Sequence, residues 1–124
     1  MPSLLLVMSG GAIGSALRYL VGRAALAAFG PAFPWGTLAV NLIGGCGMGV
    51  VAGLLMRHAI TEPLRLLLAV GVMGGFTTFS AFSLETMTML QRGDVAAASL
   101  YVAGSVAGAL LALYLGLTAA RVLA

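Results

Sequence analysis

The chain alternates long apolar runs with short segments that carry its charges, prolines and turn residues. Three runs cover Trp35–Met56, Leu66–Leu84 and Val95–Ala120, and the first extends from Met1 through Arg18 to about Phe29. Because a spanning α-helix needs about 20 apolar residues, each run is long enough to cross a bilayer. The pattern predicts an all-α membrane protein with four transmembrane helices and a single domain, residues 1–124. The junctions are expected at residues 30–34, 57–63 and 91–94.

The third run contains a cluster of residues that weaken a helix. The segment from Gly71 to Phe82 reads GVMGGFTTFSAF. Glycine and β-branched threonine both lower helix propensity, and lipid leaves unpaired backbone groups unsatisfied. We therefore expect the third helix to unwind from Gly74 to Thr78, against protein or a polar cavity. Carbonyl groups freed at such a break are a ready cation site, and this segment is the expected functional centre.

Small residues recur at four-residue spacing in the first two runs. Residues four apart share one face of a helix, and small residues on that face let a second helix approach closely. Asn41 lies on such a face, where it is either an interhelical hydrogen-bond partner or part of an ion path. The two rows are Gly10, Gly14, Arg18 and Gly22, and Thr37, Asn41, Gly45, Gly49 and Gly53.

Composition narrows the protein class. The chain is 61% hydrophobic and 7% charged, with a mean hydropathy of +1.13, which excludes a soluble surface. Its net charge of +3 comes from six single arginines near helix ends, which indicates membrane anchoring rather than nucleic-acid binding. No catalytic triad, carboxylate pair, phosphate loop or Cys/His cluster stands out in the sequence. We therefore predict that the chain is not an enzyme.

The arginines give no clear membrane orientation. With four spans, one side of the membrane receives three arginines and the other receives two or three. Such a small bias leaves two alternatives: a partner fixes the orientation, or the chain inserts both ways and forms an antiparallel homodimer. The residues are Arg57, Arg65 and Arg121 on the side of the termini, and Arg23, Arg92 and the more interior Arg18 on the other side.

Several side chains around the break suit a small anion. Phe79 and Phe82 lie three apart, and a phenyl ring has a positive edge, although core packing is the alternative for this pair. Glu85 is either a functional carboxylate or a headgroup-level residue. Arg18 either attracts anions or extends to the interface.

Three motifs, taken in order, identify a family resemblance. They are GGAIGSALRY from Gly10, GTLAVNLIG from Gly36 and GGFTTFSAF from Gly74. With them the chain resembles the Fluc/CrcB fluoride channels along essentially its full length. The resemblance implies an antiparallel, dual-topology homodimer in the bacterial inner membrane, with two fluoride pores and a central structural sodium ion. The implied function is passive, fluoride-selective export from the cytoplasm.

The resemblance also implies roles for individual residues. Sodium would be bound by the backbone carbonyls of Gly74 and Thr77. Two departures remove a hydroxyl from the family pattern, at Ala81 and Ala109. The implied pore residues are Asn41, Phe79 and Phe82, a polar track of Tyr101 and Ser105 with Ser80 and Thr37 near it, the anion-shuttling Glu85, and Arg18 near the vestibule.

The alternative function is a small dual-topology, proton-coupled exporter of drugs or cations. Such an exporter needs a central membrane carboxylate, and the first, second and fourth runs contain none. A non-conducting assembly subunit is a third class. Packing glycines suit it, but it would have no use for a broken polar helix.

Overall fold

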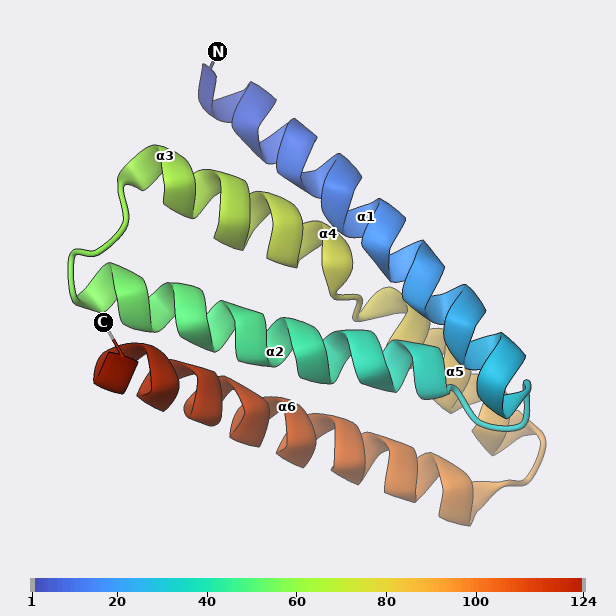
Figure 1. Cartoon of the computed structure of the whole chain (residues 1–124). Coiled ribbons are helices and arrows are strands. Elements are labelled where there is room, and N and C mark those ends of the chain that lie inside the picture. The colour runs from blue at the N-terminus through green and yellow to red at the C-terminus, as the bar shows by residue number, and fades with distance from the viewer. Residues whose placement is uncertain (1, 124) are drawn as a thin grey trace.

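The chain folds into four helical spans that lie side by side (Figure 1), described here by a computed structural model over residues 2–123. Four helical segments are long and apolar enough to cross a membrane. The described residues contain no strand, so the predicted all-α class and four spans are confirmed. The elements are α1 (Pro2–Phe29), α2 (Trp35–Met56), α3 (Glu62–Arg65), the π-helix η1 (Leu66–Met73), α4 (Gly74–Phe76), α5 (Ser80–Gln91) and α6 (Val95–Leu123).

The helix ends agree closely with the apolar runs. The bounds of α2 match the prediction, while the third span is longer than predicted and runs from Glu62 to Gln91. Glycines in the left-handed conformation follow α1 and α5, namely Gly30 (φ 77°) and Gly93 (φ 86°), as is common at helix C-termini. The four spans alternate in direction, and both chain ends lie at the same end of the bundle (Figure 1).

Helix α1 crosses η1 and α4 with backbone directly against backbone. A Cβ atom on Gly10 would lie 2.8 Å from the Cα atom of Gly71, and one on Gly14 would lie 2.8 Å from the amide nitrogen of Phe76. The predicted glycine face of the first span is therefore an interface, because a larger side chain at these positions would separate the helices.

Helices α2 and α6 run in the same direction and pack along the predicted glycine face of α2 (Figure 1). A Cβ atom on Gly45 would lie 3.0 Å from the carbonyl oxygen of Ala109, and one on Gly49 would lie 2.9 Å from the amide nitrogen of Leu117. On the α6 side, Gly116 approaches the backbone of Cys46 equally closely. Small residues on both helices thus allow this contact.

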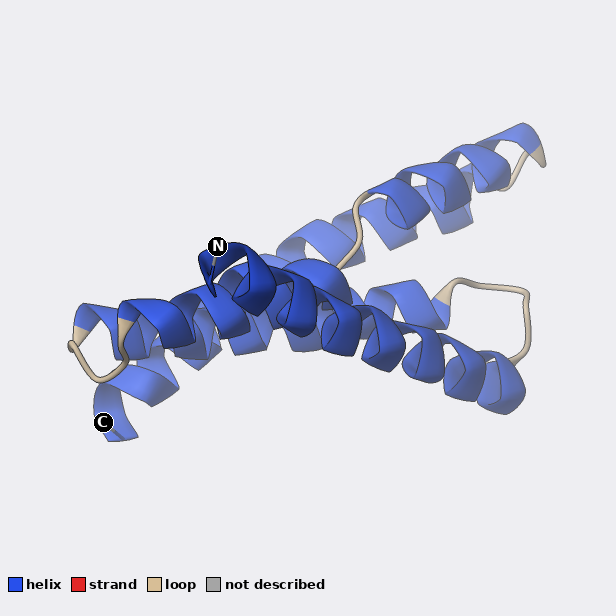
Figure 2. Ribbon diagram, turned by 90° about the horizontal axis from the view of Figure 1, so that it is seen from above, coloured by secondary structure: helices blue, strands red, loops and turns tan. Residues whose placement is uncertain are grey.

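Beyond the break, the bundle opens into two arms (Figure 2). One arm holds the end of α1 and the start of α2, and the other holds α5 and the start of α6. A small buried cluster of Met89, Ala98 and Tyr101 joins the arms, with Phe33 and Leu38 packed against it. The arms are therefore joined mainly by side chains.

Candidate functional site

The break in the third span lies at residues 77–79, later than the sequence predicted. Gly74 remains helical (φ −61°, ψ −39°), and the backbone becomes extended only at Thr77 (φ −83°, ψ 158°). The expectation of unwinding from Gly74 was therefore wrong by three residues. The helix persists because the Thr77 N–H still donates to the Met73 carbonyl, at 3.0 Å.

Asn41 of α2 holds the break open. Its Oδ1 accepts a hydrogen bond from the Thr78 N–H at 2.9 Å, and its Nδ2 donates to the Thr78 carbonyl at 3.0 Å. In an unbroken helix the Thr78 N–H would instead bond to the Gly74 carbonyl. The side chain of Asn41 thus replaces a helical backbone partner and leaves the Gly74 carbonyl without one.

The helix restarts with a side-chain cap. The Oγ1 of Thr78 accepts a hydrogen bond from the Ala81 N–H at 3.2 Å, as an N-cap threonine does. The same oxygen lies 3.4 Å from the Oγ of the exposed Ser80. Thr78 therefore ends the break with its side chain and anchors it to α2 with its backbone, a role that was not assigned from the sequence.

A cavity of about 370 Å³ lies beside the break and brings four predicted pore residues together. Phe79 immediately precedes α5 and Phe82 lies in its first turn. Their ring centroids are 5.6 Å apart, so the two rings share a face as predicted. The second ring also packs on Tyr101 of α6, with centroids 5.1 Å apart. The predicted pore residues that line the cavity are Asn41, Phe79, Phe82 and Ser105, and the predicted sodium ligand Thr77 lines it as well.

Two hydroxyl groups behind these rings are buried. Tyr101 is 1% exposed and Ser105 is 6% exposed, and neither hydroxyl has a hydrogen-bond partner among residues 2–123. Buried polar groups normally have a partner. Ser105 lines the cavity beside the break, so its hydroxyl is available to a ligand or to water there, whereas Tyr101 lies behind Phe82 and is not among the residues that line the three cavities.

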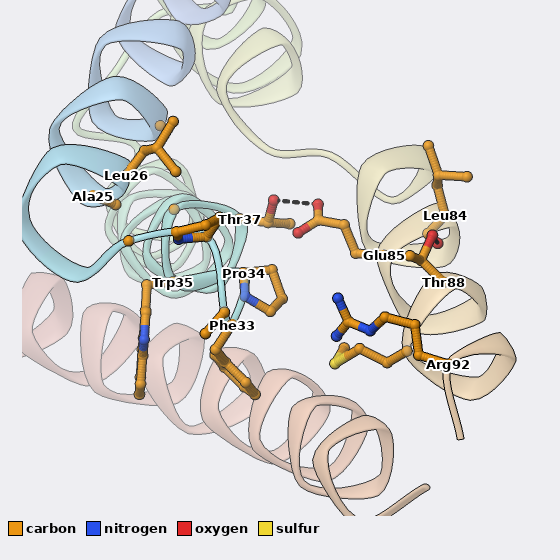
Figure 3. A pocket seen from close by; sticks show the side chains of 16 residues that line it. Ala25, Leu26, Phe33, Pro34, Trp35, Thr37, Leu84, Glu85, Thr88 and Arg92 are labelled. Carbon is orange, nitrogen blue, oxygen red and sulfur yellow. Dashed lines mark hydrogen bonds between the residues drawn. The ribbon is translucent and has the colours of Figure 1, made fainter. Parts of the chain in front are cut away.

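A second cavity, of about 410 Å³, lies between the two arms (Figure 3). Inside it the hydroxyl of Thr37 on α2 donates to Oε1 of Glu85 on α5, at 2.6 Å. The structure therefore turns the side chain of Glu85 toward α2. Arg92, which the sequence did not single out for this site, also lines the cavity.

Arg18 of α1 reaches the other side of the break. Its Nε donates to the carbonyl of Gly75 at 3.2 Å, so its side chain points to the third span. It also lines a third cavity, of about 280 Å³. Thr37 lines both this third cavity and the cavity that contains Glu85. Thr78 lines both the third cavity and the cavity beside the two phenylalanines. The three cavities thus form a series with shared walls.

Comparison with known proteins places the chain among bacterial membrane proteins. The family model described as CrcB-like protein, Camphor Resistance (CrcB), matches residues 5–117. A fluoride-specific ion channel FluC of Novosphingobium aromaticivorans is 55% identical over 117 residues, which cover 93% of each chain. The FluC proteins of Sphingopyxis alaskensis (52% identical, covering 98% of this chain and 97% of the relative) and Rhizobium etli (54%, covering 96% of each) are also similar.

Proposed function

The chain belongs to the CrcB-like family, and we propose that it is a passive, fluoride-selective channel rather than an enzyme. It is a multi-pass protein of the bacterial inner membrane, and its relatives are named as fluoride-specific ion channels at about half identity over nearly the whole chain. The observation that carries the proposal is the series of three cavities joined through Thr37 and Thr78. Fluoride leaving the cytoplasm would pass along it.

The lining suits a small anion that gives up its water. Asn41 uses one N–H and its oxygen on Thr78, which leaves a second N–H for an anion. The hydroxyl of Ser105 and the positive ring edges of Phe79 and Phe82 add further weak donors to this lining. Weak contacts let an ion enter and leave, as conduction requires.

We also propose an antiparallel homodimer with two such paths. Phe79 and Leu84 are 78% and 69% exposed in the single chain, although Phe79 lines the proposed path. A second copy would cover them and complete the cavity wall. The nearly balanced arginines at the two ends of the bundle support insertion in both orientations.

A structural sodium ion fits the break. The carbonyl groups of Gly74 and Thr77 receive no hydrogen bond from residues 2–123, and uncharged oxygens at helix C-termini and in unwound backbone are typical sodium ligands. Two carbonyls from each of two chains would hold the ion at the dimer axis. Its charge would stabilise carbonyl dipoles that the break leaves unpaired.

Gly74 offers a test of the dimer and the ion. A Cβ atom there would meet only the Ala69 carbonyl oxygen, at 3.8 Å, so the single chain tolerates a side chain. We expect Gly74→Leu to fold, yet to lose the dimer on size-exclusion chromatography and to lose sodium in elemental analysis. A variant with wild-type assembly and sodium content would contradict both proposals.

Fluoride conduction is tested with purified protein in liposomes. Valinomycin-triggered efflux, recorded with fluoride and chloride electrodes, should show fast release of fluoride while chloride is retained. If dimeric protein releases neither ion, the alternative is the proton-coupled exporter. That alternative requires a membrane carboxylate free to exchange protons, whereas Glu85 is hydrogen-bonded to Thr37.

A further inference from the structure

Arg92 has no role in the function proposed above, yet its side chain enters the cavity that contains Glu85. It follows α5 directly, and in Figure 3 its guanidinium group extends from α5 into the cavity, on the side of Pro34. Glu85 and Arg92 are the two ionisable side chains that line this cavity. The segments of α1 and α2 that face them contribute only uncharged residues.

The charge of Arg92 is only partly compensated. Its nearest acidic group is the carboxylate of Asp94, with a distance of 3.4 Å between Nη2 and Oδ2. The two side chains are 49% and 57% exposed, and such exposed ion pairs are weak. A guanidinium group has five N–H donors, so one long contact leaves most of them free for another anion.

Given the fluoride conduction proposed above, we propose that Arg92 gathers anions at the mouth of the path and that Asp94 attenuates this effect. A charge at the rim of a cleft raises the local concentration of ions of opposite sign. For one unit charge about 10 Å from the entering ion in water, Coulomb's law gives roughly a twofold increase. Half-exposed side chains bind anions only briefly, which suits an entry site.

The test compares flux at two ionic strengths in the same liposome assay. At about 0.01 M salt, where the Debye length is about 30 Å, we expect Arg92→Gln to lower the initial fluoride flux about twofold. At about 1 M salt, where it is about 3 Å, the difference should vanish. Arg92→Lys should retain wild-type flux, and Asp94→Asn should raise flux at low salt.

The matched control is Arg121→Gln, which removes one positive charge from the last turn of α6, at a residue that lines none of the three cavities. It should leave the low-salt flux unchanged. Wild-type flux in Arg92→Gln at low salt would overturn the proposal, as would a loss that persists at high salt or in Arg92→Lys. These results differ from failure of the proposed function, in which the wild-type protein itself would release no fluoride.

Discussion

The two halves of this molecule, on either side of the break, are held together by different interactions. On the side of the termini, helices touch through glycine, with Gly14 against η1 and α4 and Gly49 against α6. Beyond the break, α5 is joined to the rest by side chains, including the hydrogen bond from Thr37 to Glu85 and the tilted aromatic contact of Phe82 with Tyr101. The cavities lie at the break and beyond it.

This difference separates scaffold from path. In a bilayer, helices associate through close packing because lipid is as apolar as the side chains. Glycine contacts supply that packing but leave no room for an ion. Side-chain contacts hold α5 at a greater distance and leave polar groups at the cavity walls. We expect substitutions in the half on the side of the termini to affect folding, and substitutions in the half beyond the break to affect conduction.

The largest loss of stability is expected when a single methyl group is added to α2 on the side of the termini. The Cβ atom of Gly49→Ala would collide with the carbonyl oxygen of Leu113 and lie 2.9 Å from the nitrogen of Leu117. Because both obstacles are backbone, we expect a loss of about 3 kcal/mol in unfolding free energy. Thermal unfolding in detergent, followed by size-exclusion chromatography, measures it.

The control for this change is Gly104→Ala, on the same helix that Gly49 contacts. A Cβ atom there has no neighbour within 4 Å, and alanine favours helix by up to about 1 kcal/mol. Its stability should equal or exceed that of the wild type. Equal stability of the two alanine variants would mean that the glycine face does not hold the scaffold.

A large loss of flux without unfolding is expected at Asn41. Asn41→Leu removes both hydrogen bonds to Thr78, and Asn41→Asp removes the donor and adds a negative charge. Each hydrogen bond contributes about 1 kcal/mol to the stability of the break. Without the pair, α2 no longer holds the break in place beside the cavity, and we expect fluoride flux to fall at least tenfold. Hydrogen exchange at the Thr78 amide should quicken in the leucine variant.

The aspartate variant tests repulsion separately. We expect its flux to fall about 100-fold, below that of the leucine variant, because a fixed negative charge then faces the entering anion. Robust fluoride passage through Asn41→Asp would show that this side chain does not line the path.

The sequence predicted the four spans and the glycine faces because both depend on local periodicity. It placed the start of the break too early because propensity alone makes Gly74 the weakest point. The actual position depends on Asn41, 37 residues away, which binds Thr78 rather than its helical neighbours. A capping threonine three residues before Ala81 was a readable signal. The place of Arg92 depends on how the two arms diverge, which no local pattern encodes.

The smallest of these effects, and the finest test of the comparison, concerns the two phenylalanines. Phe79→Ile and Phe82→Ile should each reduce fluoride flux about tenfold, which corresponds to about 1.4 kcal/mol in the barrier, because isoleucine has no positive ring edge. Their stabilities should differ. The ring of Phe82 packs on Tyr101, whereas Phe79 is 78% exposed in the single chain.

Phe82→Ile loses its aromatic pairs with both Phe79 and Tyr101, which should lower its unfolding free energy by about 2 kcal/mol, whereas Phe79→Ile loses only the pair with Phe82 and should lose about 1 kcal/mol. Flux in liposomes and thermal unfolding of the same preparations separate the two effects. If the loss of flux in each variant were proportional to its loss of stability, both rings would be packing residues, which is the alternative that the sequence left open. Equal loss of flux at unequal stability would assign both rings to the path, because then only their contact with the anion is shared.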